Sequence, residues 1–559
     1  MKKTGSQIVM ECLKAQGVDL IFGYPGGQIM PIYDALYQSG LKHILTRHEQ
    51  GACHAADSYA RVSGNVGVVF ATSGPGATNL VTGLANAYMD SVPLVAVTGQ
   101  VPTASIGTDA FQEADIYGIT IPVTKYNYLV KDVNLLAETF AEAFYIARTG
   151  RPGPVLIDIP KDVQFASIEY VPTQAIPLLK YVPETRYDYA DELETLTRYL
   201  REAQRPVLYV GGGAVQSGAA AEILKIAKHA AIPVTTTLLG LGAFPCDDDL
   251  FLGFPGMHGT RCANEAIHHA DLLIAVGVRF DDRVTGDVSR FAKGAKIAHI
   301  DIDPAEHRKV VDTHLPIIGD AKEVMAALWQ RIASDTFDAH AAWLQQIATW
   351  KQQYPLTYQQ SDTTVKPQFV VQQISDLTQG EAIITTGVGQ HQMWTGQYYC
   401  FKHPRQWVTS GGLGTMGFCL PSAVGAQLAA PEKLVVCVTG DGSVQMNMQE
   451  LVTAAYYRIP IKIVVLDNGY LGMVRQWQEL FFERRYSETH LANGNPDFVA
   501  LAKSCGLEAF RISSPADVRS TLQQAFETPG PVLVHCPIEP EENVYPMIPS
   551  GKSVLETIG

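Results

Sequence analysis

The sequence predicts an α/β protein with three doubly wound domains, each a parallel sheet between two layers of helices. Short Val/Ile-rich runs that end in Gly or Pro recur along the chain, and amphipathic stretches separate them. This alternation is typical of parallel sheets with helices on both faces. The 559 residues also suit three or four domains of about 150 residues each.

The first predicted domain spans residues 1–165 and contains the apolar runs LIFGYPGG, VGVVFATSGPGATN, PLVAVTGQ and PVLIDIP. The Pro-rich stretch YVPTQAIPLLKYVPETRYDY then interrupts the pattern and predicts a linker. The second predicted domain spans residues 190–335. It contains RPVLYVGGGAV, IPVTTTLLGLG, ADLLIAVGVRF and KIAHIDIDP.

The third predicted domain covers residues 366–545, after the helical stretch HAAWLQQIATWKQQYP, and a tail of residues 546–559 follows it. It contains EAIITTGVGQ, KLVVCVTGDGS, IKIVVLDNG and PVLVHCPI. GVVFATSGPGATN in the first domain and LVVCVTGDGSVQMN in the third are both apolar runs that open at a Gly-rich turn. No strict period exists, so we expect a structural similarity between these domains rather than a repeat array.

The composition argues against several classes of partner. Lys and Arg number 42 against 56 Asp and Glu, and no basic run offsets the net charge of −14, which disfavours nucleic acid and anionic membranes. No apolar run approaches the roughly 18 residues of a membrane span. The first residues, MKKTGSQIVMECLKAQG, lack the apolar core of a signal peptide. The nine cysteines, without a CxxC pair, predict reduced, mostly buried thiols of a cytoplasmic protein rather than disulfides or a zinc site.

Two polar motifs predict a metal site in the third domain. Asp441 lies in GDG directly after one apolar run, and Asn468 lies in DNG after the next run, 27 residues later. Ligands of parallel sheets bind at the carboxyl ends of the strands, and a carboxylate with an amide and a backbone carbonyl suits Mg²⁺ held with a diphosphate. Each motif alone is more simply a turn. The pair at βαβ spacing favours the metal site.

This spacing resembles the diphosphate–metal motif of thiamine diphosphate enzymes. Over about 540 residues the chain is similar to the catalytic subunit of acetohydroxyacid synthase (acetolactate synthase). The motifs that carry the resemblance are FGYPGG, RHEQGA, TSGPGATN, GTDAFQE, GRPGPVLIDIPKD, GMHGT, RFDDRVTG, VGQHQMW, SGGLGTMG, LGMVRQWQ and NVYPMIPSG. The resemblance implies a pyrimidine-binding, a central FAD-associated and a diphosphate-binding domain, in that order.

The implied reaction decarboxylates pyruvate and condenses the hydroxyethyl carbanion with pyruvate or 2-oxobutanoate. The products are 2-acetolactate or 2-aceto-2-hydroxybutanoate, used in branched-chain amino acid biosynthesis. The implied cofactors are thiamine diphosphate, Mg²⁺ and FAD, which has no net redox role in this family. The implied assembly is a homodimer or homotetramer. Members often pair with a small regulatory subunit, and the sequence leaves that partner open.

The resemblance assigns Glu49, in RHEQGA, to the pyrimidine ring, where its hydrogen bond favours the tautomer that acts as base. Family members place this Glu and the metal site in different subunits. An isolated RHE would more simply be a solvated acid at a helix start. The matching cofactor positions are the metal ligands Asp441, Asn468 and Tyr470, the diphosphate contacts Gln390, His391, Gly442 and Ser443, and the wall residues Gly414 and Met416 beneath the bent cofactor.

Arg279, in VGVRFDDRVTG, resembles the residue that holds the carboxylate of the second oxo acid, a task that suits a bidentate guanidinium. Its alternative is an interdomain salt bridge. Trp477 resembles the family's discriminator for a larger acceptor. The other matching pocket positions are Gly26, Phe111, Gln112, Lys161, Met257 and Met473, although each apolar one alone would be assigned to the core. The resemblance also implies FAD contacts for Arg151, His258, Arg279, Arg283, Asp301 and Asp320. The Gly-rich turn GGGAV of this domain by itself fits no GxGxxG fingerprint.

Two positions depart from the family pattern. Asp467 stands where members usually have Asn, which adds a carboxylate beside the metal site, and Gly387 stands where Asp is common. Three other functions stay open at this point. They are a flavin-dependent oxidoreductase of the pyruvate oxidase type, a non-catalytic homologue, and a glyoxylate-using carboligase, which typically lacks the Glu found here.

Overall fold

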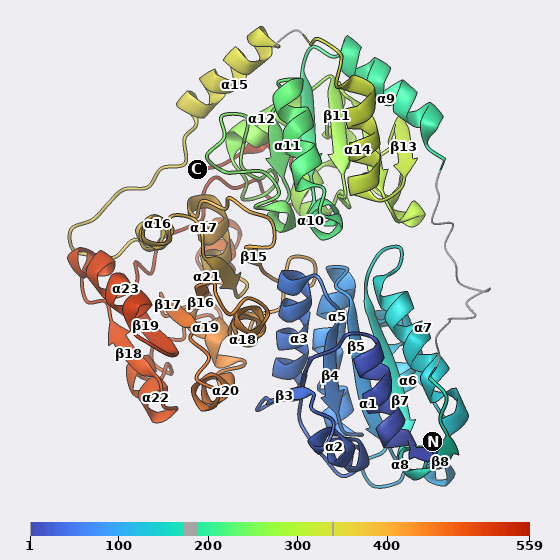
Figure 1. Ribbon diagram of the computed structural model, residues 1–559. Helices are drawn as coiled ribbons and strands as arrows, with labels where there is room; N and C mark the ends of the chain where they lie inside the picture. The colour runs from blue at the N-terminus through green and yellow to red at the C-terminus, as the bar shows by residue number, and fades with distance from the viewer. Residues whose placement is uncertain (1, 173–187, 338–339) are drawn as a thin grey trace.

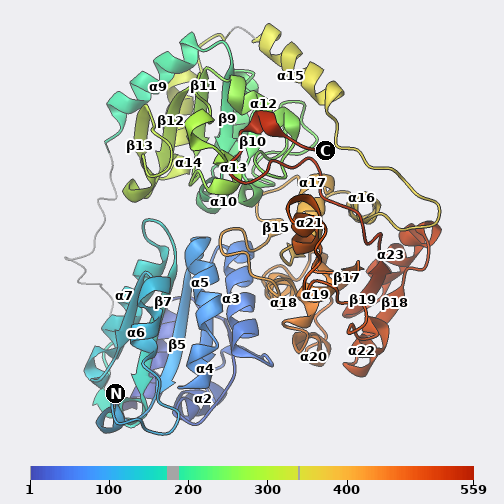
Figure 2. The ribbon, with the colours of Figure 1, turned by 180° about the vertical axis from the view of Figure 1, so that it is seen from behind.

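The computed structural model describes residues 2–172, 188–337 and 340–559. Three parallel sheets flanked by helices form three domains, which confirms the predicted fold class (Figure 1). The N-terminal and C-terminal domains lie side by side, and the central domain lies across one end of both (Figures 1 and 2). Most of the predicted linker lies outside the described residues.

The N-terminal sheet has the strand order β3-β2-β4-β5-β7-β6, and all its strands are parallel. Its strands are β2 (Leu20–Gly23), β3 (Lys42–Leu45), β4 (Gly67–Ala71), β5 (Leu94–Gln100), β6 (Tyr126–Leu129) and β7 (Pro154–Pro160). Its helices are α1 (Gly5–Ala15), α2 (Met30–Tyr37), α3 (Glu49–Ser63), α4 (Pro75–Thr78), α5 (Val81–Met89), α6 (Ile116–Thr120), α7 (Leu136–Arg148) and α8 (Lys161–Phe165). A small antiparallel pair, β1 (Lys2–Thr4) with β8 (Ser167–Glu169), extends this domain to Glu169.

The central sheet is also parallel, with the order β10-β9-β11-β12-β13. Its strands are β9 (Pro206–Val210), β10 (Val234–Thr236), β11 (Leu272–Val276), β12 (Lys296–Asp301) and β13 (Leu315–Ile318). Its helices are α9 (Ala190–Glu202), α10 (Gly212–Ser217), α11 (Ala220–His229), α12 (Arg261–His269), α13 (Asp282–Thr285) and α14 (Ala321–Ile332). Helix α15 (Ala341–Gln353) packs on α12 before the chain enters the third domain.

The C-terminal sheet has the order β15-β14-β16-β17-β19-β18. Its strands are β14 (Ile383–Thr386), β15 (Trp407–Val408), β16 (Val435–Gly440), β17 (Lys462–Asp467), β18 (Glu508–Arg511) and β19 (Val532–Pro537). Its helices are α16 (Pro367–Thr378), α17 (Gln390–Tyr398), α18 (Cys419–Ala429), α19 (Asp441–Gln445), α20 (Glu450–Tyr456), α21 (Gly472–Phe481), α22 (Phe498–Ser504) and α23 (Val518–Glu527). Numbered within each domain, this order equals that of the N-terminal sheet, so the expected similarity of the two domains is found.

The central strands of all three sheets carry near-continuous Val, Ile and Leu because helices cover both faces. In each sheet the first and third strands are neighbours, and the connections run outward from this pair in opposite directions. The carboxyl ends of these two strands form the crevice where ligands of such folds bind. Helices α3 and α18 pack directly against each other and join the N-terminal domain to the C-terminal domain (Figure 1). No helix within the described ranges combines the length and apolarity needed to cross a membrane.

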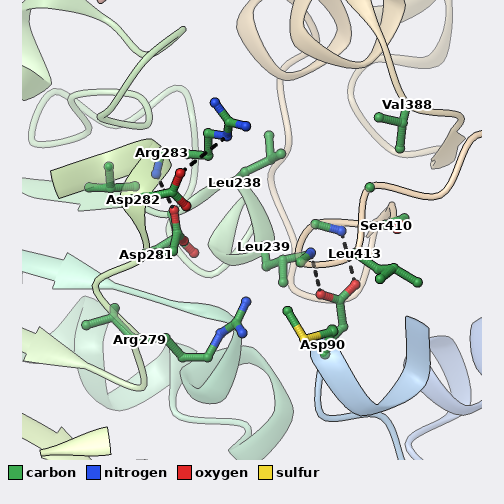
Figure 3. Close-up of a pocket in the computed structure, with 18 of the residues that line it drawn as sticks. Asp90, Leu238, Leu239, Arg279, Asp281, Asp282, Arg283, Val388, Ser410 and Leu413 are labelled. Carbon is green, nitrogen blue, oxygen red and sulfur yellow. Dashed lines mark hydrogen bonds and ion pairs between the residues drawn. The ribbon is translucent and has the colours of Figure 1, made fainter. Parts of the chain in front are cut away.

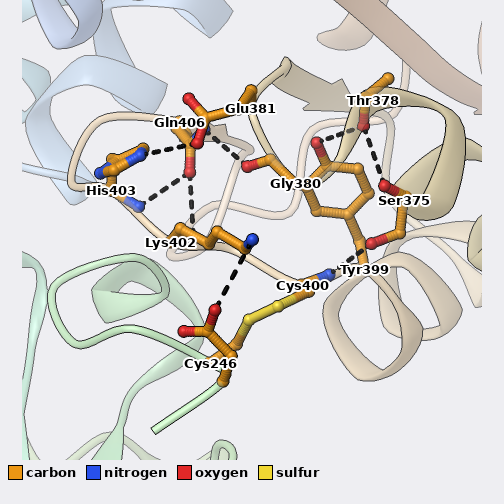
Figure 4. Close-up of a disulfide and its surroundings, with 11 residues drawn as sticks. Cys246, Ser375, Thr378, Gly380, Glu381, Tyr399, Cys400, Lys402, His403 and Gln406 are labelled. Carbon is orange, nitrogen blue, oxygen red and sulfur yellow. Dashed lines mark hydrogen bonds and ion pairs between the residues drawn. A yellow bond between two sulfur atoms is a disulfide. The ribbon is translucent and has the colours of Figure 1, made fainter.

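The expectation that every cysteine is a reduced thiol is wrong for one pair. Cys246 of the central domain and Cys400 of the C-terminal domain form a disulfide, with their Cα atoms 5.4 Å apart (Figure 4). The cysteines are 154 residues apart, so their spacing along the chain gives no sign of the pairing. The fold brings them together because the backbone of the central-domain loop docks on the segment after α17, where the Cys246 amide donates to the Phe401 carbonyl at 3.1 Å.

Candidate active site

A cavity of about 1450 Å³ lies where the three domains meet (Figure 3). A smaller cavity of about 60 Å³ adjoins it in the C-terminal domain. The two are parts of one site because they share wall residues, namely Val388, Gly389, Met416, Met473 and Val474. Both open at carboxyl ends of parallel strands, as the fold rule predicts.

The smaller cavity contains the predicted metal residues. Asp441 begins α19 directly after β16, and Asn468 follows β17, which pairs with β16 in parallel register. Adjacent strands therefore bring the two side chains to one edge. The smaller cavity is lined by the sequence-predicted residues Gln390, His391, Met416, Asp441, Gly442, Ser443, Asn468, Tyr470 and Met473.

Hydrogen bonds fix the orientation of the Asn468 amide. Its Nδ2 donates to Gln390 Oε1 at 3.2 Å, and its Oδ1 accepts from the Tyr470 amide at 3.1 Å. Gln390 in turn donates to Gln476 Oε1 at 2.9 Å, and the fully buried Gln476 donates to the Val544 carbonyl at 3.0 Å. This network joins the turn at Gln390 to α21, which carries the predicted pocket residues Met473 and Trp477. Sequence reasoning missed Gln476, since nothing in its motif indicates a buried relay.

Asp441 is held by a residue that sequence reasoning also missed. Asn495 Nδ2 donates to Asp441 Oδ2 at 2.8 Å and lies 3.4 Å from Asp467 Oδ1. The additional carboxylate of Asp467 is bonded to His535 Nε2 at 2.8 Å, and it is not among the residues that line either cavity. Burial raises the pKa of the Asp441 carboxyl above its ordinary value. A nearby cation would counteract that shift by favouring the carboxylate.

The oxygen donors at this edge fit Mg²⁺. Asp441 provides a carboxylate, Asn468 an amide oxygen and Tyr470 a backbone carbonyl, which are hard ligands of the kind this ion takes together with substrate phosphates. Gly387 packs closely against the turn, because a Cβ there would lie 2.2 Å from Ser443 Oγ and 2.8 Å from His391 Nε2, and one of these side chains would have to shift.

The larger cavity combines apolar and cationic residues from the other predicted sets. It is lined by Arg151, Met257, His258, Arg279, Arg283, Asp301, Asp320, Gly414, Met416, Met473 and Trp477. Arg279 extends into this space and forms no ion pair with any residue that the structure describes, so the interdomain salt bridge is not found (Figure 3). Trp477 packs edge-on to Phe481 with ring centroids 5.5 Å apart.

One end of the larger cavity is lined by residues of the central domain. Arg151 crosses from the N-terminal domain to Glu306, with Nη1 2.6 Å from Oε1, and its Nε donates to Ser91 at 2.7 Å. Burial lowers the pKa of His258 to about 4, so this imidazole is neutral at pH 7. Burial also raises the pKa of Asp301, at the end of β12, to about 7. A Cβ on Gly213 would lie 2.8 Å from the Gly277 Cα, so the Gly-rich turn packs tightly against the next strand end.

Five sequence-predicted residues of the N-terminal domain line neither cavity: Gly26, Glu49, Phe111, Gln112 and Lys161. They follow the carboxyl ends of β2, β3, β5 and β7 and thus share a different sheet edge. Glu49 accepts from Asn79 Nδ2 at 3.0 Å, and its Oε1 would lie 3.2 Å from a Cβ on Gly76. Phe111 is 85% exposed. One chain therefore carries two separate groups of candidate site residues.

The fold and these two groups define a class of enzyme. Family models for the thiamine pyrophosphate enzymes match all three domains, with the N-terminal TPP binding domain at residues 3–119, the central domain at 193–328 and the C-terminal TPP binding domain at 387–536. The chain is a thiamine pyrophosphate enzyme.

Full-length relatives narrow the family. The chain is 49% identical over 564 residues to the acetolactate synthase large subunit of Parasynechococcus marenigrum (strain WH8102), across 100% of this chain and 91% of the relative. It is 48% identical to the acetolactate synthase large subunit of Corynebacterium glutamicum, across 99% of this chain and 89% of the relative. It is also 48% identical to the acetolactate synthase isozyme 2 large subunit of Escherichia coli (strain K12), across 99% of both. The chain belongs to the acetolactate synthase large-subunit family, which confirms the resemblance.

Proposed function

We propose that the protein decarboxylates pyruvate and joins the remaining two-carbon unit to pyruvate or 2-oxobutanoate. The products are 2-acetolactate or 2-aceto-2-hydroxybutanoate, in cytoplasmic branched-chain amino acid biosynthesis. The observation that carries the proposal is one continuous site. Its small end has the Mg²⁺-type donors Asp441 and Asn468, and its large end is lined by Trp477 and by Arg279, which forms no ion pair with the described residues.

The small end suits thiamine diphosphate with Mg²⁺. Asp441, Asn468 and the Tyr470 carbonyl would hold the metal ion, and the diphosphate contacts would come from Gln390, His391, Gly442 and Ser443. When bound, thiamine diphosphate supplies the nucleophilic carbon that allows a 2-oxo acid to lose CO₂. Met416, which lines both cavities, and Gly414, which lines the larger one, would form the wall against which the cofactor bends.

The large end suits the acceptor oxo acid and a flavin. Arg279 would hold the acceptor carboxylate through its two parallel N–H groups. Met257, Met473 and Trp477 would exclude water, so that the acceptor rather than a proton reaches the reacting carbon. The central-domain end would bind FAD through Arg151, His258, Arg279, Arg283, Asp301 and Asp320.

The second group of residues supports a homodimer or a homotetramer built from such dimers. Glu49, Gly26, Phe111, Gln112 and Lys161 share an edge away from the cavity of their own chain. A two-fold related partner would place this edge over the open site of its neighbour. Glu49 would then reach the pyrimidine ring bound by the other subunit. The relatives carry the name large subunit, which supports a small regulatory subunit as a further partner.

The activity is tested by incubating the protein without oxygen with pyruvate, Mg²⁺, thiamine diphosphate and FAD, and quantifying acetolactate. We expect acetolactate from the wild type and none from Glu49→Gln. Acetate or acetyl phosphate together with reduced flavin, and no acetolactate, would instead establish an oxidoreductase of the pyruvate oxidase type.

Shared sites are tested by mixing Glu49→Gln with Asp441→Asn. Each variant alone is expected to be inactive. After dissociation and reassociation, a mixed dimer would have one site with both residues intact, so about a quarter of wild-type activity should return. If Glu49 and Asp441 of the same chain served one site, no activity would return.

A further inference from the structure

Near α3 and α18, the N-terminal and C-terminal domains are joined by two buried carboxylates that have not been assigned to the site. Each domain provides one carboxylate, which accepts hydrogen bonds from backbone amides of the other domain. Asp90, which caps the C-terminal end of α5 in the N-terminal domain, reaches the C-terminal domain (Figure 3). Its Oδ2 accepts from the Gly411 amide at 3.0 Å, and its Oδ1 accepts from the Gly412 amide at 2.7 Å. Asp90 is 5% exposed, so these bonds lie almost out of contact with water.

The segment that Asp90 holds is the loop of residues 409–417, between β15 and α18. Gly414 and Met416 of this loop line the larger cavity, and Met416 also lines the smaller one. The loop is thus the wall on which the bound cofactor would rest, and it has no regular secondary structure of its own to fix its shape.

A buried ion network keeps Asp90 in place. Arg61 of α3 donates to Asp90 Oδ2 at 3.0 Å, to Asp57 Oδ1 at 2.6 Å and to the Thr409 carbonyl at 3.1 Å. Nearby, Asn86 of α5 accepts from the Ser410 hydroxyl at 2.6 Å. The N-terminal domain therefore contacts the start of the loop as well as its two glycine amides.

The C-terminal domain returns a similar contact. Glu450, the first residue of α20, is 1% exposed, and its two carboxylate oxygens accept from the Arg47 amide at 3.0 and 3.2 Å. Arg47 lies two residues before Glu49, in the loop between β3 and α3. Gly51 leaves the space that Glu450 fills, because a Cβ there would lie 2.4 Å from Glu450 Oε1.

We propose that Asp90 and Glu450 are reciprocal positioning residues, each fixing the site-bearing loop of the other domain. Asp90 fixes the cofactor wall around Gly414 and Met416, and Glu450 fixes the loop that presents Glu49. The proposal rests on the proposed function. Carboxylate–amide bonds suit this task because a buried carboxylate oxygen can accept directly from a backbone amide, and a site that must be in place before reaction depends on such support.

Asp90→Asn is the most direct perturbation. The amide keeps one acceptor oxygen but turns an NH₂ group towards the other glycine amide or Arg61, where donor meets donor. Without ligands, we expect hydrogen exchange of the 411–412 amides to accelerate at least about tenfold. We also expect the dissociation constant for thiamine diphosphate in Mg²⁺ to rise about tenfold, a change of about 1.4 kcal/mol. In Glu450→Gln, we expect faster exchange at Arg47 and a lower kcat, with the KM for pyruvate within about twofold of wild type.

Asp271→Asn is a matched control. The Asp271 carboxylate also accepts from two successive amides, Gln204 at 2.8 Å and Arg205 at 2.9 Å, but it lines neither cavity. It should change local exchange and leave cofactor affinity and kcat unaltered. If Asp90→Asn does not fold, Arg61→Lys replaces it. This variant keeps the charge but loses the planar fork of nitrogen donors that reaches Asp57, Asp90 and Thr409 at once, and a smaller change in the same direction is expected.

Unaltered exchange at 411–412 in Asp90→Asn, or at Arg47 in Glu450→Gln, would overturn the proposal. Faster exchange with unchanged cofactor affinity and kcat would also overturn it, because the carboxylates would then only join the domains. A wild-type protein that does not bind thiamine diphosphate would refute the proposed function. The exchange measurements would still decide whether the two loops are held.

Discussion

Reducing the Cys246–Cys400 disulfide should lower the thermal stability measurably. The bridge closes a loop across 154 residues and joins the central domain to the C-terminal domain. In the chain-entropy account, a closed loop of this length restricts the unfolded chain by about 5 kcal/mol at 25 °C. Unfolding entropy of about 2.1 cal/mol/K per residue gives about 1.2 kcal/mol/K for the whole chain, so Tm should fall by about 4 °C.

The domains should remain docked after reduction. The Cys246 amide still donates to the Phe401 carbonyl, and Lys402 lies 3.6 Å from Asp247 (Figure 4). Differential scanning calorimetry with and without a thiol reductant measures the shift, and Cys400→Ser should reproduce it without reductant. Cys505→Ser, which alters a free, half-buried thiol of the same domain, is the control.

Thiol counting tests the premise separately. Protein unfolded without reductant and alkylated should carry seven labels, because seven cysteines are free. Nine labels would refute the disulfide, and seven labels with an unchanged Tm on reduction would refute the entropic reasoning.

Three further predictions concern single side chains. Burial raises the pKa of Asp158 to about 7, so its contribution to stability is present below about pH 4 and is lost as the pH rises through 7. Between pH 4 and pH 8, the free energy of unfolding of Asp158→Asn should therefore rise by up to about 4 kcal/mol relative to that of the wild type, as measured by denaturant titrations. Arg279→Lys should raise the KM for the acceptor oxo acid about tenfold, as a lysine cannot bind a carboxylate through two parallel bonds, and an unchanged KM would exclude that role. Gly387→Ala should weaken thiamine diphosphate binding in a direct titration, since its Cβ would displace Ser443 or His391; equal affinity would show that the turn relaxes.

The residues at the carboxyl ends of the strands could be predicted from the sequence, because they depend on local patterns. An apolar run predicts a buried strand, and the polar residue after it falls at the carboxyl end. Asp441 and Asn468 meet because consecutive strands β16 and β17 are also neighbours in the sheet. Gln390 follows β14, which pairs with β16, and so reaches the same edge.

Contacts between distant segments could not be predicted in this way. Asn495 lies in the loop between α21 and α22, which does not directly follow a strand, yet it holds Asp441. His535 lies within β19, and its partner Asp467 is recognisable only once β17 and β19 are paired. Asp467 illustrates the same limit. The sequence shows an added carboxylate next to Asn468, and only the structure shows that this carboxylate contacts both His535 and Asn495, the residue that holds Asp441.

The reciprocal carboxylates follow from the shared topology of the outer domains. Loop 409–417 and the loop before Glu49 are equivalent, since each follows the second strand of its domain and precedes α18 or α3. Asp90 and Glu450 are borne by helices that follow the third strand of their own domains, β4 and β16. The outer domains have one strand order and pack through the equivalent helices α3 and α18, but Asp90 stands at the C-terminal end of its helix and Glu450 at the N-terminal end of its own. The two contacts are therefore reciprocal without being symmetry-equivalent. This interface can hold both loops within each chain. The residues that line the cavity and the separate group that includes Glu49 would meet only when a second copy of the chain is added.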